Sequence, residues 1–89
     1  MIETQVTIIN KLGLHARAAA KLVSTASAFG SRIKVGYPDK MVDGKSIMAV
    51  MMLAASKGTE LLLQVEGDDQ EQAMEAVLDI INRRFDEEE

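Results

Sequence analysis

The sequence predicts an α+β open-faced sandwich, in which an antiparallel or mixed β-sheet is covered by helices on one face. Two patterns carry this prediction: short segments whose apolar residues alternate, and longer segments whose apolar residues recur at helical spacing. These segments follow one another in the order βαββαβα. A chain of 89 residues that is 47% hydrophobic can build one core, so we expect residues 1–89 to form a single domain.

The first half of the chain is predicted to form a strand, a helix and a hairpin. Apolar and polar residues alternate within 3–9, which is the pattern of a half-buried strand. The Ala-rich segment 16–29 has apolar residues at helical spacing and ends before Gly30. Alternation at 32–37, a Pro-Asp turn and a return at 40–43 predict a β-hairpin.

The second half is predicted to form two helices around a strand. The unbroken apolar segment 47–55 is rich in Met and Ala, which favours a helix, and Ser46 is its expected N-cap. Residues 60–67 alternate as the last strand. A final helix follows, with acidic residues at its positive end and Arg83-Arg84 at its negative end. We expect residues 86–89 to be a frayed acidic tail.

The composition of the chain argues against several classes of function. A net charge of −4 argues against a sequence-independent grip on nucleic acid, which requires many cations. The absence of Cys excludes disulfides and thiolate metal sites and fits a reducing compartment, so we expect a cytoplasmic protein. The first ten residues do not have the pattern of a signal peptide, and no apolar stretch is long enough to span a membrane. With one His and no carboxylate cluster, we expect no metal and no cofactor.

His15, the only histidine, stands at the entrance to the first predicted helix. The first N–H groups of a helix have no intrahelical partner and attract anions, so Ala16 and Ala18 offer backbone donors beside the ring. The positive helix end disfavours an imidazolium, which predicts a neutral, nucleophilic ring. Arg17 can form bidentate hydrogen bonds to a phosphoryl group. The alternative interpretation is that His15 is a cap or surface residue and that Arg17 is merely solvated.

Segments 13–17 (Gly-Leu-His-Ala-Arg), 44–48 (Gly-Lys-Ser-Ile-Met) and 57–60 (Lys-Gly-Thr-Glu) together resemble the bacterial HPr phosphocarrier family. The resemblance covers essentially the whole chain and implies a four-stranded antiparallel sheet with three helices on one face. It also implies a phosphoryl relay, in which the Nδ1 atom of His15 accepts phosphate from enzyme I and passes it to an enzyme II A domain. Arg17 corresponds to the arginine that stabilises the phosphate. Such a protein is a carrier with a phosphohistidine intermediate rather than a stand-alone enzyme.

The chain departs from the family at Ala18, where Pro is usual. Alanine keeps an N–H group that proline lacks but loses the fixed φ of the first turn. The departure predicts a changed rate or equilibrium of phosphoryl transfer rather than its loss.

The resemblance also implies a regulatory site and a docking surface. Ser46 corresponds to the serine that HPr kinase/phosphorylase modifies. Its expected role as a helix N-cap does not depend on whether it is phosphorylated. The expected partner-binding residues are Ala20, Lys21, Ser24, Ile47, Met48 and Met51. Lys11, Arg17, Lys21 and Lys45 would surround this surface with positive charge and steer acidic partners. A carrier protein that presents one surface to successive partners works best as a monomer, so we expect a monomer.

Two other interpretations remain open from the sequence. The βαββαβ order is shared by small ferredoxin-like domains that bind ligands. A purely regulatory HPr-like protein, without phosphorelay activity, would keep the serine but would not need His15. Sugar-system and nitrogen-system relatives share the acceptor histidine, so the resemblance does not separate these two branches.

Overall fold

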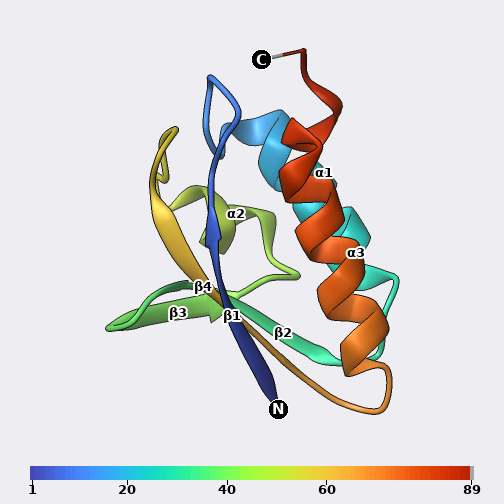
Figure 1. The fold of residues 1–89 in the computed structure, drawn as a ribbon. Coiled ribbons are helices and arrows are strands. Elements are labelled where there is room, and N and C mark those ends of the chain that lie inside the picture. The colour runs from blue at the N-terminus through green and yellow to red at the C-terminus, as the bar shows by residue number, and fades with distance from the viewer. Residues whose placement is uncertain (89) are drawn as a thin grey trace.

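The computed structural model describes residues 1–88 and confirms the predicted α+β open sandwich (Figure 1). The strands are β1 (Ile2–Thr7), β2 (Arg32–Tyr37), β3 (Lys40–Asp43) and β4 (Glu60–Glu66). The helices are α1 (Ala16–Ser27), α2 (Ile47–Met51) and α3 (Gln70–Asn82). The four strands pair antiparallel in the order β1-β4-β2-β3, so the first and last strands of the chain lie side by side.

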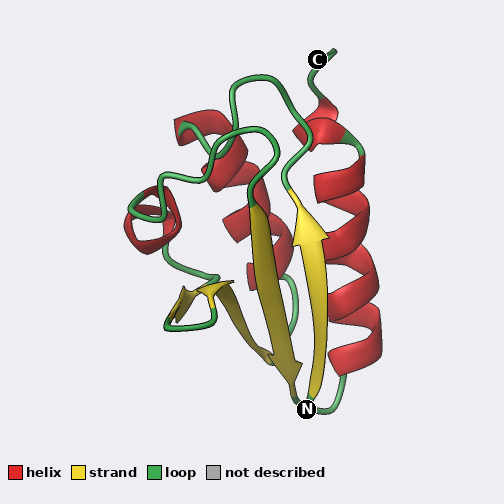
Figure 2. Cartoon of the chain, turned by 60° about the vertical axis from the view of Figure 1, so that its left-hand side comes forward, coloured by secondary structure: helices red, strands yellow, loops and turns green. Residues whose placement is uncertain are grey.

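The core lies between one face of the sheet and the helices α1 and α3 (Figures 1 and 2). Alternation places Val35 and Leu63 on this face, where they pair across β2 and β4 and are fully buried. Helix α1 buries small side chains such as Ala19 and Ala26 in the core, and its backbone packs against α3 and α2. These contacts fix α1 in the fold, and the segment that precedes α1 carries His15.

Helix α2 is shorter than the sequence predicts. We expected a helix over 47–55, but it ends at Met51. Leu53 and Ala55 are buried outside the helix, and Ala54 between them has a left-handed backbone with φ of 52°. A continued helix would not bury both side chains against the core, so burial in the connecting segment overrides helix propensity.

Asp69 connects the start of α3 to the loop after α1. Its carboxylate accepts hydrogen bonds from the amide groups of Gly30 and Ser31, both at 3.0 Å, and from the Ser31 hydroxyl. The hydrogen bond from the Ser31 hydroxyl contributes most to holding the pKa of this carboxyl below its usual value, and the bond from the Gly30 amide contributes next. Burial acts in the opposite direction but has a smaller effect. The contact fixes α3 beside α1, and the C-terminal segment that follows α3 is positioned with it.

The C-terminal segment is not the frayed tail that we expected, as far as the described residues show. Arg84, Phe85 and Asp86 form a left-handed turn with φ of 57°, 54° and 64°. Phe85 is fully buried, and its carbonyl accepts a hydrogen bond of 2.9 Å from Lys21 Nζ. An isolated Phe in a charged segment has no periodic pattern, but burying one aromatic side chain is enough to hold the chain end. Glu89 lies outside the described residues.

Candidate functional site

His15 is the N-cap residue of α1, with the extended backbone typical of that position. Its carbonyl accepts the amide of Ala19 at 2.9 Å, and its side chain makes no capping hydrogen bond. The ring is 28% exposed, so it is accessible to a partner. The amides of the first turn, from Ala16 to Ala18, lack intrahelical acceptors and form the positive end of the helix. An anion attached to the exposed ring would therefore meet backbone donors.

The loop before His15 is held by backbone contacts that only glycine permits. Gly13 has a left-handed φ of 68°, and a Cβ atom there would lie 2.4 Å from the carbonyl oxygen of Ala55. The neighbouring Leu14 amide donates to that same oxygen at 2.8 Å. Asn10 closes the loop from the other side, since its Nδ2 donates to the Gly13 carbonyl at 2.8 Å. The position of His15 thus depends on the distant segment around Ala55 and on Asn10 in the same loop.

Glu87 contacts the His15 ring, which the sequence analysis did not anticipate. One of its carboxylate oxygens is hydrogen-bonded to His15 Nε2, and the other accepts from Asn10 Nδ2 at 3.0 Å. The Glu87 side chain is only 14% exposed. The only sequence signal for these contacts is the acidic end of the chain, which is usually a solvated segment. The last described residues of the chain lie beside the start of α1 (Figure 1).

Charges of both signs meet at this end of the molecule. Burial raises the pKa of Glu87, but the hydrogen bonds from Asn10 and His15, together with the charges of His15 and Arg17, outweigh it and hold that pKa below its usual value. Arg17 is exposed and lines a surface hollow with Leu12 and Glu87. Within residues 1–88 its guanidinium has no hydrogen bond or ion pair and is free to meet an anion.

Ser46 is the N-cap of α2, as the sequence predicts. Its Oγ accepts a hydrogen bond from the Ala49 amide at 3.3 Å. The residue is half-buried. Helix α2 packs against α1, so the serine belongs to the element beside the helix that begins at His15.

Apolar side chains on α2, just after it and in the loop before His15 are exposed. Ile47, Met48 and Met51 are 42%, 73% and 39% exposed, and Met52 and Leu12 are each 67% exposed. The last two were not among the predicted docking residues. We call these five residues the apolar patch. Exposed Met side chains adapt to several partner surfaces, which suits a docking surface.

The predicted docking residues of α1 differ in their surroundings. Ser24 is exposed and Ala20 is half-buried. Lys21 bonds to the Phe85 carbonyl and lies 3.6 Å from Asp86, while Lys45 Nζ donates to the Phe29 carbonyl at 2.7 Å. Each of these two lysines therefore holds a backbone carbonyl of the fold, which the sequence does not indicate.

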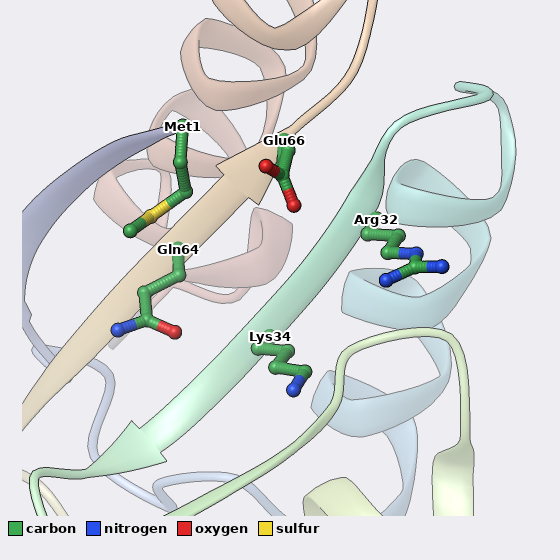
Figure 3. Close-up of a pocket in the computed structure, with 5 residues that line it drawn as sticks. All are labelled: Met1, Arg32, Lys34, Gln64 and Glu66. Carbon is green, nitrogen blue, oxygen red and sulfur yellow. The ribbon is translucent and has the colours of Figure 1, made fainter.

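A second hollow lies on the open face of the sheet, away from His15. Figure 3 shows its lining, formed by Met1, Arg32, Lys34, Gln64 and Glu66 from β2, β4 and the chain start. Its side chains are those of the solvent-facing strand positions, and no pair of a nucleophile and a base occurs among them. The chemistry is thus concentrated at the opposite end of the molecule, where α1 begins.

Within residues 1–88, no helix is long and apolar enough to cross a bilayer. No group of three or more histidine, aspartate or glutamate residues there is arranged to hold a metal ion.

Comparisons with known proteins identify the family of the chain. The family model described as "PTS HPr component phosphorylation site" matches residues 2–83. The phosphocarrier protein HPr of Pseudomonas aeruginosa is 58% identical over 93% of both chains, and the phosphocarrier protein NPr of Shewanella violacea is 40% identical over 97% of this chain and 94% of its own. A crystal structure of HPr from Thermoanaerobacter tengcongensis matches with a TM-score of 0.95 and 48% identity over 100% of both chains. The chain therefore belongs to the HPr family, the phosphocarrier proteins of the phosphotransferase system.

Proposed function

We propose that His15 is the residue that carries the phosphoryl group, received from phosphorylated enzyme I and passed to an enzyme II A domain. The observation that supports this most is the partly exposed ring at the start of α1, next to Arg17 and the first-turn amides of the helix. Within the described residues, no group of three or more His, Asp or Glu side chains is arranged to hold a metal ion at this end. The alternative of a ligand-binding domain has no comparable site in its favour.

The proposed step needs no metal and no base from this chain. The bond between phosphorus and the donor histidine nitrogen of enzyme I breaks, and a bond forms between phosphorus and Nδ1 of His15. The ring gains a positive charge, while the phosphoryl oxygens face the amides of Ala16 and Ala18 and the guanidinium of Arg17. In the transfer to the enzyme II A domain, the bond between phosphorus and Nδ1 of His15 breaks, a bond forms between phosphorus and the acceptor atom of that domain, and the His15 ring becomes neutral again.

The apolar patch, with Ala20, Lys21 and Ser24 on α1, is the proposed docking surface for both partners. It is supported by the exposure of the methionines and by the packing of α2 against α1. Because Lys21 is bound to the C-terminal turn, we assign it mainly to holding that turn.

We also propose that the protein works in the cytoplasm as a monomer. The higher identity to an HPr than to an NPr favours the sugar branch.

Replacement of His15 by alanine is expected to abolish phosphorylation. Wild-type protein incubated with enzyme I and phosphoenolpyruvate should gain one acid-labile phosphate, seen by intact-mass spectrometry, and His15→Ala should gain none. An acid-labile phosphate on His15→Ala would refute the assignment.

Arg17→Ala is expected to be phosphorylated at least about tenfold more slowly than wild type in the same reaction, because one charge-assisted donor is lost.

We propose that Ser46 is also phosphorylated, by HPr kinase/phosphorylase. Its Oγ lies at the start of α2, where a dianion is electrostatically tolerated, and the added charge would slow docking of an acidic partner. ATP and the kinase should add one acid-stable phosphate to wild type and to Ser56→Ala, and none to Ser46→Ala. Loss of the cap should also lower the free energy of unfolding of Ser46→Ala by about 1 kcal/mol. An unmodified wild type with an active kinase would leave Ser46 with the capping role alone.

A further inference from the structure

The Glu87 carboxylate is built into the site rather than placed beside it by chance. One oxygen is bonded to His15 Nε2, and the other accepts from Asn10 Nδ2. Asn10 is itself fully buried and donates its second amide hydrogen to the Gly13 carbonyl. Both carboxylate oxygens are therefore used, and the group that orients Glu87 also closes the loop that carries His15.

The contact decides which ring nitrogen is available for reaction. A carboxylate only accepts hydrogen bonds, so Nε2 must carry the proton that it donates to Glu87. In a neutral ring the other nitrogen, Nδ1, then has the free lone pair. No hydrogen bond to Nδ1 is found within residues 1–88. The arrangement is that of a histidine oriented by an acidic residue, the role that the aspartate plays in a catalytic triad.

The C-terminal turn supplies this carboxylate at the cost of backbone strain. Arg84, Phe85 and Asp86 all have left-handed φ values, a conformation that residues other than glycine rarely adopt. It is held by burial of Phe85, by Lys21 at the Phe85 carbonyl and by the ion pair of Arg83 with Asp86 at 3.2 Å. Strain that the surroundings enforce is typical of functional positions. Here the first residue after the turn is Glu87.

We propose that Glu87 is a positioning residue for phosphoryl transfer, which fixes the His15 ring with Nε2 protonated and Nδ1 free to attack. The inference rests on the proposed role of His15. When Nδ1 is phosphorylated and Nε2 keeps its proton, the ring is cationic, and the carboxylate at Nε2 stabilises this charged form. Glu87 thus speeds formation of the phosphohistidine and shifts the transfer equilibrium toward it.

The test compares Glu87→Gln and Glu87→Ala with Glu88→Gln. Glu88 is exposed and has no hydrogen bond or ion pair within the described residues, so its replacement makes the same change of net charge without touching the ring. A glutamine at 87 can accept from Nε2 with its oxygen, but its amide group then faces the Asn10 amide, and two donors cannot pair. Two quantities are measured: the initial rate of phosphorylation by enzyme I and phosphoenolpyruvate, and the proton NMR signal of the hydrogen-bonded Nε2–H.

We expect wild type and Glu88→Gln to show a slowly exchanging Nε2–H signal and equal rates. Both Glu87 variants should lose that signal, and their rates should fall by about tenfold or more, the size of effect seen when the outer-shell partners of metal-binding histidines are removed. Thermal unfolding of Glu87→Gln should match that of Glu88→Gln, which separates positioning from a loss of structure. Rates of the Glu87 variants equal to or above that of Glu88→Gln would overturn the proposal, since a tail that merely covers the ring predicts faster reaction.

The two proposals fail in different ways. If wild type takes up no phosphate on His15, the proposed function fails, and the Nε2–H signal still reports whether Glu87 binds the ring. If His15 is phosphorylated normally in every Glu87 variant, the proposed function stands and the positioning role is refuted.

Discussion

Replacing Phe85 by alanine is expected to lower the free energy of unfolding by about 3 kcal/mol and to detach the C-terminal turn. Removing a fully buried Phe side chain costs about 3–5 kcal/mol through lost burial and the remaining cavity. Each left-handed residue stores about 1–2 kcal/mol, and part of this is returned when the turn is released. The net loss therefore falls at the low end of the range. It is a large share of the roughly 4–13 kcal/mol of stability typical of a chain of this length.

Urea unfolding followed by circular dichroism measures this loss of stability. The phosphorylation rate reports whether Glu87 still contacts His15. Arg84→Gly is the matched control, since it removes strain from the same turn at an exposed position and keeps the aromatic anchor. It should stay within about 1 kcal/mol of wild type. A Phe85→Ala protein as stable as Arg84→Gly would show that Phe85 does not hold the turn.

Replacing Gly13 by alanine is expected to destabilise the fold by about 2 kcal/mol or more and to slow phosphorylation of His15 by at least about tenfold. The new Cβ atom would lie 2.4 Å from the Ala55 oxygen and 2.8 Å from the Ser56 Cα, so the backbone must move. The shift breaks the bond from the Leu14 amide to Ala55, one residue before His15. A displacement of about 1 Å at a reacting group is enough to cost this much rate.

Alanine substitutions at two other glycines separate the steric clash at Gly13 from the strain of its left-handed backbone. Gly58 also has a left-handed φ, of 91°, but a Cβ atom there meets nothing within 4 Å, so Gly58→Ala tests strain alone. Gly30 has neither strain nor a close neighbour, and Gly30→Ala should be nearly neutral. Unfolding free energies and phosphorylation rates of the three variants are the measurement. Equal losses in Gly13→Ala and Gly58→Ala would contradict the steric argument.

The fold could be predicted well from the sequence because its signals are local. Alternation at 32–37 and at 60–67, and helical spacing at 16–29, identify elements that the structure confirms within two residues at each end. The N-cap at Ser46 and the helix start after His15 follow from the same local rules. The position of His15 at a helix start is thus available from the sequence alone.

The parts that could not be predicted depend on contacts between distant residues. The contact of Glu87 with His15 joins residues 72 apart, and Asn10 supports it from a loop that carries no motif. Lys21 looks like a free surface cation in the sequence, although it bonds to the carbonyl of a turn 64 residues away. Helix α2 ends early because Leu53 and Ala55 are drawn into the core. Periodicity does not encode any of these contacts, so only the three-dimensional structure reveals them.

The central claim is that the phosphoryl group is carried on Nδ1 of His15 while Nε2 keeps its proton. Protein labelled with nitrogen-15 and phosphorylated by enzyme I and phosphoenolpyruvate can be examined by long-range proton–nitrogen correlation with phosphorus detection. The account predicts a phosphorus–nitrogen coupling to Nδ1 of this single histidine and a proton on Nε2. Coupling to Nε2, or a phosphate on any other residue under these conditions, would contradict it.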